Sequence, residues 1–501
     1  MKFVADLHLH SKYSRAVSQQ MVLAKMVEWA RYKGISVLAT GDFTHPYWFE
    51  TLRNELEEAR NGLYKLKTTV HSPQTTAVES RRSTEDKQDV YFLLSCEISS
   101  IYTQGDKVRR IHNLFFFPSI ASVEKLNNEL LKRGANLRSD GRPIVGISSR
   151  DLAQIALSCD QKALIIPAHA WTPWFSIFGS FSGFDSIEEC FRDMAGHIYA
   201  IETGLSSDPA MNWRIADLEG RSILSFSDAH SLMKMGREAT VFEAEEISYD
   251  SIYNAIIGTK RQRAGGDKEN DSVSFGSSAT SVTSPQIAFT IEFYPEEGKY
   301  HFTGHRNCNF SQSPQETEKD GNICPVCGRQ LTIGVMHRVE ELATQNSRLP
   351  KPPPAMLRNA MRAGGTGGQA KFKIQNINGV RWVYPEGNSR PPYVSLVPLD
   401  EILAEALGSS VGTKKVMDQY MTLVGASGSE FNVLLKTDLV EIAKYASSRV
   451  VEGIGKIRSG DIVVEPGYDG KYGVVKIWQE TQEDTDNAGQ ENQKGQLNLF
   501  A

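Results

Sequence analysis

Short apolar runs alternate with longer amphipathic segments along the first half of the chain. The apolar runs have the length and residue types of buried strands, and the segments between them have the spacing of helices. This alternation predicts an α/β fold with a parallel sheet or barrel. The expected strands cover residues 3–9, 35–39, 91–96, 112–117, 163–167 and 222–226.

The segment between the first two strands illustrates the helical spacing. Its apolar residues recur every three or four positions, as on one face of a helix. Ser18 is expected to cap the start of this helix and Gly34 its end. The apolar face consists of Met21, Val22, Leu23, Met26, Val27 and Ala30.

Changes in composition divide the chain further. A polar segment at 64–89 reads as a loop or insertion, and a Gly-, Asp- and Ser-rich segment at 264–284 reads as a linker. Beyond the linker we expect a strand hairpin (287–294 and 299–303), helices near 400–407, 414–424 and 436–457, and a hairpin near 461–478. The expected parts are a barrel at 1–263, the linker, a hairpin and cysteine module at 285–345, an α+β region at 346–479 and a disordered tail at 480–501.

Composition narrows the class of protein. The chain has 501 residues, 40% hydrophobic and 23% charged, and no apolar run approaches the ~20 residues of a membrane span. The N-terminus lacks the apolar core of a secretory signal, so a cytoplasmic protein is expected. A net charge of -5 argues against nucleic-acid binding through overall positive charge, but it permits a local basic face or a metal cluster.

Imidazole and carboxylate groups accompany most of the predicted strands. In a barrel the C-terminal strand ends converge on one face, so these groups would meet there. A single histidine is more often structural, but His-x-His, Asp-x-x-His and Ser-Asp-Ala-His together favour a site for two or three divalent ions, zinc, manganese or magnesium. The candidate ligands are His8, His10, Asp42, His45, Glu97, His112, His169, Asp228 and His230.

A second cluster of ligands has the spacing of a structural zinc site. His305-x2-Cys308 precedes Cys324-x2-Cys327 by fifteen residues, which is typical of a zinc ribbon. His301 and His337 are alternatives to His305 as the fourth ligand. The other three cysteines lie among apolar residues and are expected to be core thiols.

The motifs DLHLHSKYS, GDFTHP, the isolated Glu97, PAHAW and FSDAH resemble those of the PHP (polymerase and histidinol phosphatase) superfamily, in the usual order. The resemblance implies a distorted (β/α)7 barrel with up to three metal ions. It assigns His8, His10, Glu97 and Asp228 to one catalytic ion, with Glu97 bridging to a second ion held by His112 and His169. His230 with His45 or Asp42 would hold a third, although Ala16 replaces a histidine that some members have.

Longer motifs resemble the endonuclease Q family over nearly the whole chain. They are PAHAWTPWFSIFGS, FSDAHSLMKMGREAT, IEFYPEEGKYH, CPVCGRQLTIGVMHRVEELA and EPGYDGKYG. The resemblance implies hydrolysis of DNA on the 5′ side of a deaminated base (uracil, hypoxanthine or xanthine) or an abasic site. The products would be a 3′-hydroxyl and a 5′-phosphate.

Such an enzyme has to extrude the damaged nucleotide from the duplex and stack it in a pocket. Trp171 and Trp174 follow His169 directly and are the expected stacking wall, although core packing is the alternative for the neighbouring phenylalanines. Lys234 and Arg237 are candidate phosphate ligands, with an exposed helix face as the alternative. The segment 453–456 (GIGK) weakly suggests a helix-hairpin-helix turn.

The C-terminus ends in an apolar cluster after a polar stretch. Gln496, Leu497, Leu499 and Phe500 resemble the motif by which bacterial proteins bind the sliding clamp. This pattern predicts the clamp as a partner.

Other interpretations remain open at this level. They are a phosphatase of small phosphate monoesters, a 3′–5′ exonuclease and a non-catalytic DNA-binding protein. The zinc module and the tail argue against the first, and the complete ligand set argues against the last.

Overall fold

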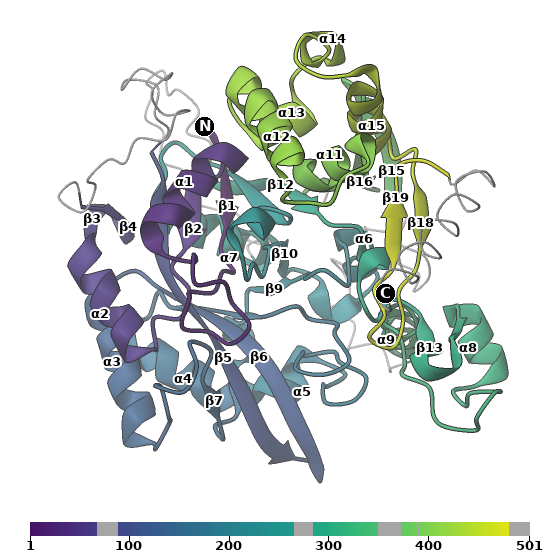
Figure 1. Ribbon diagram of the computed structural model, residues 1–501. Helices are drawn as coiled ribbons and strands as arrows, with labels where there is room; N and C mark the ends of the chain where they lie inside the picture. The colour runs from purple at the N-terminus through teal and green to yellow at the C-terminus, as the bar shows by residue number, and fades with distance from the viewer. Residues whose placement is uncertain (68–88, 265–283, 349–371, 388–389, 480–501) are drawn as a thin grey trace, which may run out of the picture.

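The protein is described from a computed structural model that covers residues 1–67, 89–264, 284–348, 372–387 and 390–479 (Figure 1). Most of the expected linker and insertion, and all of the tail with Gln496, Leu497, Leu499 and Phe500, lie outside the described residues. Among the described helices, none has the length and hydrophobicity needed to cross a membrane.

The fold is α/β and is built on one mixed sheet of thirteen strands. Its main path runs through ten strands. Of the other three, β6 and β7 pair with β5, and β8 pairs with β6. The path is β15 (Phe372–Ile377), β16 (Val380–Pro385), β17 (Tyr393–Ser395), β12 (Gln286–Glu292), β11 (Ala239–Glu243), β1 (Lys2–Asp6), β2 (Val37–Ala39), β5 (Tyr91–Gln104), β4 (Leu63–Leu66) and β3 (Leu56–Arg60). The attached strands are β6 (Lys107–Phe117), β7 (Ile144–Val145) and β8 (Leu164–Pro167).

Some of these strands, with two more, follow one another around a ring. β1, β2 and β5 pair in parallel, β6 pairs antiparallel with β5 and β8, and β8 lies beside β9 (Ala200–Glu202). β9 pairs in parallel with β10 (Ser222–Leu224), and the chain after β10 returns to the chain after β1 through a bridge between Ala229 and Leu9. The segments that carry the candidate ligands therefore lie around one interior.

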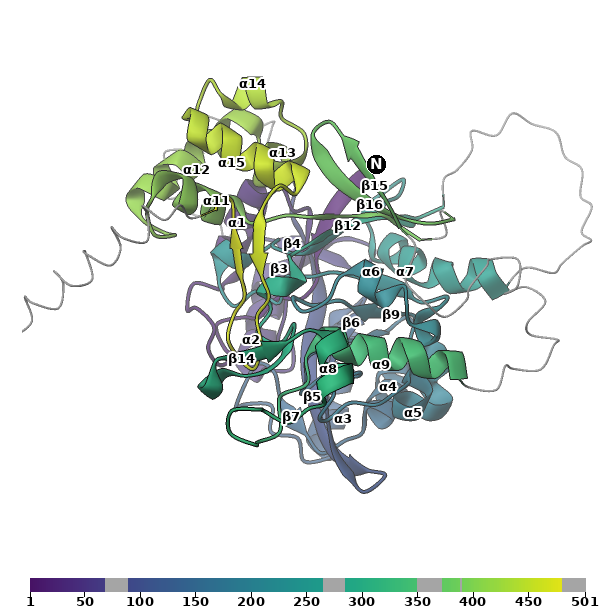
Figure 2. The ribbon, with the colours of Figure 1, turned by 90° about the vertical axis from the view of Figure 1, so that its right-hand side faces the viewer.

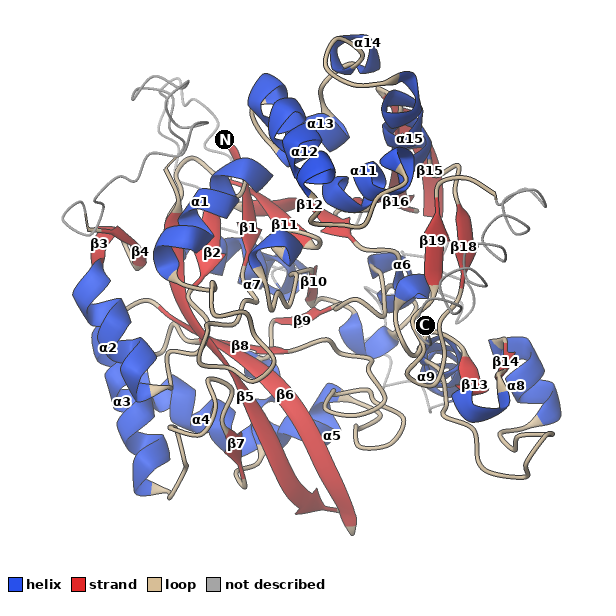
Figure 3. Ribbon diagram, in the orientation of Figure 1, coloured by secondary structure: helices blue, strands red, loops and turns tan. Residues whose placement is uncertain are grey.

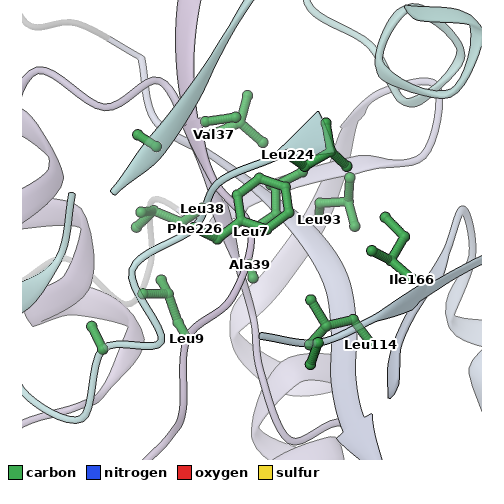
Figure 4. Close-up of a cluster of buried hydrophobic side chains, with 14 of the residues drawn as sticks. Leu7, Leu9, Val37, Leu38, Ala39, Leu93, Leu114, Ile166, Leu224 and Phe226 are labelled. Carbon is green, nitrogen blue, oxygen red and sulfur yellow. The ribbon is translucent and has the colours of Figure 1, made fainter. Parts of the chain in front are cut away.

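Apolar side chains fill this interior (Figure 4). Leu93 of β5, Leu114 of β6 and Ile166 of β8 point toward Leu7 and Phe226, and each is 1% exposed or less. Because side chains alternate along a strand, the face of β5 that carries Leu93 also carries Glu97 four residues later. By the same rule His112 shares the face of Leu114. The core thus determines where two of the candidate ligands point.

The β5–β6 hairpin is longer than the sequence indicated. We expected strand 91–96 to end at Glu97 and strand 112–117 to begin at His112, but β5 continues to Gln104 and β6 already starts at Lys107. Glu97 and His112 therefore lie inside an antiparallel pair, and the hairpin extends well beyond the ring (Figure 3). The extension contains Thr, Ser and Arg residues, because its outer part is not buried on both faces. It therefore lacks the continuous apolar run by which the strands were predicted.

Helices connect and cover the strands. The first helix begins at Leu23 rather than next to Ser18, but it ends as expected at Gly34, whose φ of 89° suits a left-handed C-cap. The helices of this part are α1 (Leu23–Lys33), α2 (Pro46–Glu55), α3 (Ile120–Lys132), α4 (Ser149–Cys159), α5 (Ile187–Phe191), α6 (Pro209–Asn212) and α7 (Tyr249–Ala264), with 3-10 turns η4 (Arg192–His197), η5 (Ala216–Leu218) and η6 (Leu232–Lys234).

The cysteine module lies beside the ring (Figure 2). The expected hairpin of 287–294 and 299–303 does not form, because β12 joins the large sheet while β13 pairs with β14. The loop at Asp469, between β18 (Val463–Glu465) and β19 (Val474–Lys476), packs onto the module. There Asp469 accepts hydrogen bonds from Arg306 N and Thr332 Oγ1. The module comprises η7 (Pro295–Glu297), β13 (Thr303–His305), η8 (Arg306–Cys308), β14 (Phe310–Gln312), α8 (Pro314–Asp320) and α9 (Val335–Arg348).

Five helices form a separate layer above the large sheet (Figures 1 and 2). The segment 453–456 lies inside α15, so it is not a helix-hairpin-helix turn. A buried ion pair of 2.7 Å between Lys33 of α1 and Glu430 of α13 joins this layer to the ring. The elements are α11 (Leu399–Leu407), α12 (Lys414–Ser427), α13 (Glu430–Leu435), α14 (Leu439–Ile442) and α15 (Ser448–Ser459), followed by the hairpin β18 (Val463–Glu465) and β19 (Val474–Lys476).

Candidate metal centre

His8 and His10 follow β1 and are both 1% exposed. The Nδ1 atom of each histidine lies within hydrogen-bond distance of a carboxylate. Glu202 Oε1 is 2.9 Å from His8 Nδ1, and Asp42 Oδ1 is 3.1 Å from His10 Nδ1. Because an ionised carboxylate only accepts hydrogen bonds, these contacts place the proton of a neutral imidazole on Nδ1, and in that tautomer the Nε2 lone pair faces the cluster. Both Nε2 atoms are buried without a hydrogen-bond partner.

Glu97 lies at the centre of the histidines. Its Oε2 is 3.4 Å from His10 Nε2 and 3.8 Å from His8 Nε2. Its Oε1 is 2.6 Å from His112 Nδ1 and 3.1 Å from His169 Nε2. The two oxygens of one carboxylate thus face two different pairs of imidazoles.

His169 follows β8 in an unusual backbone conformation. Its φ is 29°, and a side chain at Gly204, itself at φ 62°, would place Cβ 2.5 Å from His169 Cβ. The backbone N–H of His169 donates to Glu202, so one carboxylate fixes both His8 and His169. Asp42 and Asp228 also have positive φ values, of 50° and 46°. Such conformations cost energy in non-glycine residues and concentrate at functional sites.

Asp228 and His230 complete the cluster from the loop after β10. Asp228 Oδ1 is 3.2 Å from His10 Nε2 and 3.5 Å from His8 Nε2, and it has no hydrogen-bond partner. His230 Nδ1 donates to the carbonyl of Asp228 at 2.9 Å, which leaves its Nε2 free. The side chain of Asp228 is 26% exposed, so the cluster opens to solvent on this side.

The donor atoms form three overlapping groups. Within each group, one atom from each residue lies within 4.8 Å of the others, close enough to surround a single ion. Neutral imidazole and carboxylate donors suit divalent transition metals, and the unpartnered buried atoms give such an ion ligands that nothing else satisfies. The groups are His8–His10–Glu97, His10–Asp228–His230 and Glu97–His112–His169.

Burial and neighbouring charges shift the pKa values of these groups strongly. For Glu97 and Asp228, burial alone would raise the pKa, but the neighbouring histidines, with Arg142 at Glu97, outweigh it and hold the pKa well below its usual value. Burial lowers the pKa of His112 to about 4, despite its contact with Glu97. The second pair of imidazoles therefore includes one that stays neutral and able to bind a metal at ordinary pH.

Two predicted ligands lie outside the three groups. Asp42 is fully buried behind His10, and it accepts hydrogen bonds from Ser11 N and Ser14 Oγ at 2.7 and 2.9 Å. His45 contacts the carbonyl of Arg138 and stacks on Tyr13 with ring centroids 4.5 Å apart. In the structure Asp42 orients His10, and His45 packs at the periphery.

Sequence reasoning missed Glu202 and Arg142. Glu202 ends a short apolar strand, as other candidate ligands do, but no histidine motif accompanies it. Arg142 lies 3.1 Å from Glu97 Oε2 and belongs to a loop without any recognisable motif. Because the three-residue strand β9 was not among the expected strands, a search for charged residues at the ends of predicted strands would not have found Glu202 either.

The aromatic loop after His169 has both buried and exposed members. Trp171 is not available to a nucleotide, because it is 1% exposed, packs on Phe178 and donates its indole N–H to Asn212. Trp174 is partly exposed and stacks on Phe181 with centroids 4.7 Å apart and planes 4° apart. Phe181 is 43% exposed. The accessible aromatic pair is therefore Trp174 with Phe181.

The two candidate phosphate ligands are engaged in the fold. Lys234 pairs with Glu401 of α11, and its side chain is 38% exposed. Arg237 donates to the carbonyls of Ser227 and Asp228 at 2.8 and 3.3 Å. Arg237 therefore supports the loop that carries Asp228.

The predicted cysteine cluster comes together. His305, Cys308, Cys324 and Cys327 each offer a donor atom within 4.8 Å of the others. Burial opposes ionisation of Cys324, but the backbone N–H groups of Cys327 and Val326 overcome it and lower the pKa of this thiol to about 6. His301 is buried elsewhere and His337 pairs with Glu341, so neither competitor joins the cluster.

Known relatives cover the chain to different extents. The MJ0043 C-terminal domain family matches residues 398–461, the helical layer. The uncharacterized protein MJ0043 of Methanocaldococcus jannaschii is 28% identical over 62% of this chain, and the match spans only 31% of that longer protein. The uncharacterized protein YqxK of Bacillus subtilis is 26% identical over 95% of this chain and 99% of its own.

Two solved structures match nearly the whole fold. One is the lesion-specific endonuclease Q of Pyrococcus furiosus, with a TM-score of 0.70 and 27% identity over 97% of this chain and 99% of that one. The other is endonuclease Q in complex with a 27-mer duplex substrate with an abasic lesion at its active site, with the same TM-score and identity and 100% of that chain covered. The chain is therefore similar to endonuclease Q over nearly its whole length, and its three donor groups could hold metal ions.

Proposed function

We propose that the protein is a DNA repair endonuclease that hydrolyses the phosphodiester on the 5′ side of a deaminated base or an abasic site. The observation that carries the proposal is the centre of three overlapping donor groups in a chain that aligns end to end with endonuclease Q. Both solved relatives are nucleases, and one of them holds an abasic duplex.

The ring of strands is in this proposal a distorted (β/α)7 barrel of the PHP type. The pairing from β1 around to β10 and back, with seven strands in the circuit, supports it. The proposed domains are this barrel (1–263), the strand and cysteine module (285–345) and the C-terminal α+β region (346–479). All three contribute strands to the large sheet, the second of them through β12.

The proposed roles follow from the geometry. Two or three divalent ions held by the donor groups would activate water and stabilise the charge that develops on phosphate and leaving oxygens. Glu97 would hold two of the groups together, since its two oxygens face different imidazole pairs. Glu202 and Asp42 would keep His8 and His10 in the tautomer that binds metal.

Substrate contact is assigned to the exposed aromatic pair. Trp174 and Phe181 are stacked in a loop that is held by backbone hydrogen bonds, including the one from Phe181 N to Pro173 O at 3.0 Å. His112 contacts Phe175 of the same loop with centroids 4.9 Å apart, so the pair stands beside the metal centre. A rigid exposed aromatic surface there would stack against bases displaced from the duplex.

The four-donor cluster is proposed to bind structural zinc. A closed set of one imidazole and three thiolates supports folding of a small module and leaves no open position for chemistry. Binding of the bacterial sliding clamp by Gln496, Leu497, Leu499 and Phe500 stays a prediction from the sequence.

The test is a labelled duplex with one uracil, hypoxanthine or abasic site, incubated with and without Mn²⁺. The wild-type protein and the surface control Asp193→Asn should nick directly 5′ of the lesion only when metal is present. Asp228→Asn should nick at least 100-fold more slowly, because it loses a ligand at the centre. An intact lesion duplex under all conditions would refute the proposal.

A further inference from the structure

Arg142 occupies the mouth of the metal centre. Its Nη1 is 3.1 Å from Glu97 Oε2, and its side chain is 27% exposed while that of Glu97 is 1% exposed. The guanidinium thus lies between the buried central carboxylate and solvent. A phosphate that approaches the centre from this side meets Arg142 first.

The loop that carries Arg142 is held firmly. Arg142 N donates to Asp140 Oδ1 at 3.1 Å, and Gly141 N donates to Tyr13 O at 3.1 Å. Gly141 is pressed against Asp42, since a Cβ there would lie 2.4 Å from the Asp42 carboxyl group. The backbone that carries Arg142 is therefore fixed, and the contact with Glu97 orients its guanidinium.

Most of the donor capacity of Arg142 is unused. Guanidinium has five N–H groups, and within the described residues its one side-chain hydrogen bond is the contact with Glu97. By contrast Arg221, whose side chain is 8% exposed, donates to the carbonyls of Ile198 and Asp217 and to Glu188. The planar fork matches the geometry of phosphate oxygens.

We propose that Arg142 is a catalytic residue that binds a non-bridging oxygen of the scissile phosphate. The inference rests on the proposed phosphodiesterase reaction. In that reaction the oxygen of water forms a new bond to phosphorus, the bond to the 3′ oxygen breaks, and a proton from water ends on that 3′ oxygen. Arg142 transfers no proton and stabilises the negative charge of the transition state.

The test compares wild type, Arg142→Ala and a control, Arg138→Ala, which removes an exposed arginine from the same loop. Three quantities are measured: Mn²⁺ affinity by calorimetry, affinity of the Mn²⁺-loaded proteins for inorganic phosphate, and the rate of nicking at an abasic site. Free guanidinium is added to the alanine variant as a rescue.

For Arg142→Ala we expect unchanged or tighter Mn²⁺ binding, because a cation that competes for Glu97 is gone. Phosphate affinity should fall about 10- to 100-fold and the nicking rate about 100-fold, with partial rescue by guanidinium. Equal phosphate affinity in the two alanine variants, or a parallel loss of Mn²⁺ affinity, overturns the inference. If wild type binds phosphate through Arg142 but nicks no DNA, the assignment of Arg142 stands and the endonuclease function falls.

Discussion

At the residue scale, the candidate metal centre depends on carboxylates that lie outside its donor groups. The Glu202 carboxylate contacts the imidazole of His8 and accepts a hydrogen bond from the backbone N–H of His169. These two histidines are 161 positions apart in the sequence (169 minus 8). Motifs revealed the ligands because histidines at strand ends are conspicuous. They did not reveal Glu202, because a glutamate after a short strand has no distinctive neighbours.

We predict that Glu202→Gln weakens Mn²⁺ binding about 10- to 100-fold, because His8 loses the charged partner that fixes its tautomer. Nicking should recover when Mn²⁺ is raised. A Mn²⁺ titration of nicking measures both effects, with the exposed Glu245→Gln as the control. Equal metal requirements in the two variants would contradict the assigned role of Glu202.

Glu292 gives a prediction about pH. Burial raises the pKa of Glu292 to about 8, although hydrogen bonds from Ser225 and Thr290 oppose the shift. Between the ordinary value near 4.5 and about 8, the folded state holds a proton that the unfolded state has lost. The free energy of unfolding should therefore fall as pH rises, by up to about 1.4 kcal/mol per pH unit.

Glu292→Gln removes this titration and keeps the size of the side chain. Thermal unfolding from pH 5 to 8 should accordingly show a flatter decline for the variant than for wild type. Parallel pH profiles for the two proteins would mean that Glu292 is already ionised in the fold.

At the scale of elements, the sequence predicted where the strands β5 and β6 lie more accurately than where they begin and end. The apolar runs at 91–96 and 112–117 located β5 and β6, but not the paired, partly exposed extension that continues to Gln104 and starts at Lys107. Tertiary pairing, not hydrophobicity, determines those ends. The same limit explains why the helix-hairpin-helix prediction for segment 453–456 was wrong. Its glycines lie within helix α15 and pack against Trp478 and Leu439, which the sequence pattern could not indicate.

Helix α9 of the cysteine module is attached to the aromatic loop by one arginine. Arg338 donates to the carbonyls of Phe178 and Phe184 at 3.1 and 3.3 Å and pairs with Asp185. Its side chain is 11% exposed. The module thereby supports the segment that holds Trp174 and Phe181.

Arg338→Met should weaken binding of an abasic duplex about tenfold, since loss of a charged hydrogen-bond network loosens the loop. Mn²⁺ affinity should not change. Fluorescence anisotropy in the presence of Ca²⁺ measures duplex binding, and a Mn²⁺ titration measures metal affinity. Arg329→Met, which changes an exposed arginine, is the control. Weaker Mn²⁺ binding by Arg338→Met would show instead that the contact supports the whole centre.

At the scale of the whole molecule, the sequence predicted the parts better than their arrangement. The α/β class, the ligand cluster and the four-donor cluster follow from local patterns. That β12 and β15–β17 extend the sheet of the ring could not be predicted, because pairing between distant strands leaves no local pattern. The docking of the helical layer likewise depends on a lysine, Lys33, that looks ordinary in the sequence.

Lys33 and Glu430 are 1% and 4% exposed, and Tyr420 OH also donates to Glu430 at 2.7 Å. Lys33→Met should cost about 3–5 kcal/mol, because it leaves a buried carboxylate unpaired. The double variant Lys33→Met with Glu430→Gln should recover part of that loss. Denaturant unfolding measures this, and Lys25→Met, from an exposed ion pair, should cost about 1 kcal/mol or less. Additive losses in the double variant would contradict a coupled pair.

The most direct test of the central claim uses a covalently closed circular duplex with a single abasic site. We predict a metal-dependent conversion to the nicked circle, with one break directly 5′ of the lesion and no cleavage of the undamaged circle. Closed circles that stay intact while linear ends are degraded would identify an exonuclease, and they would contradict the account.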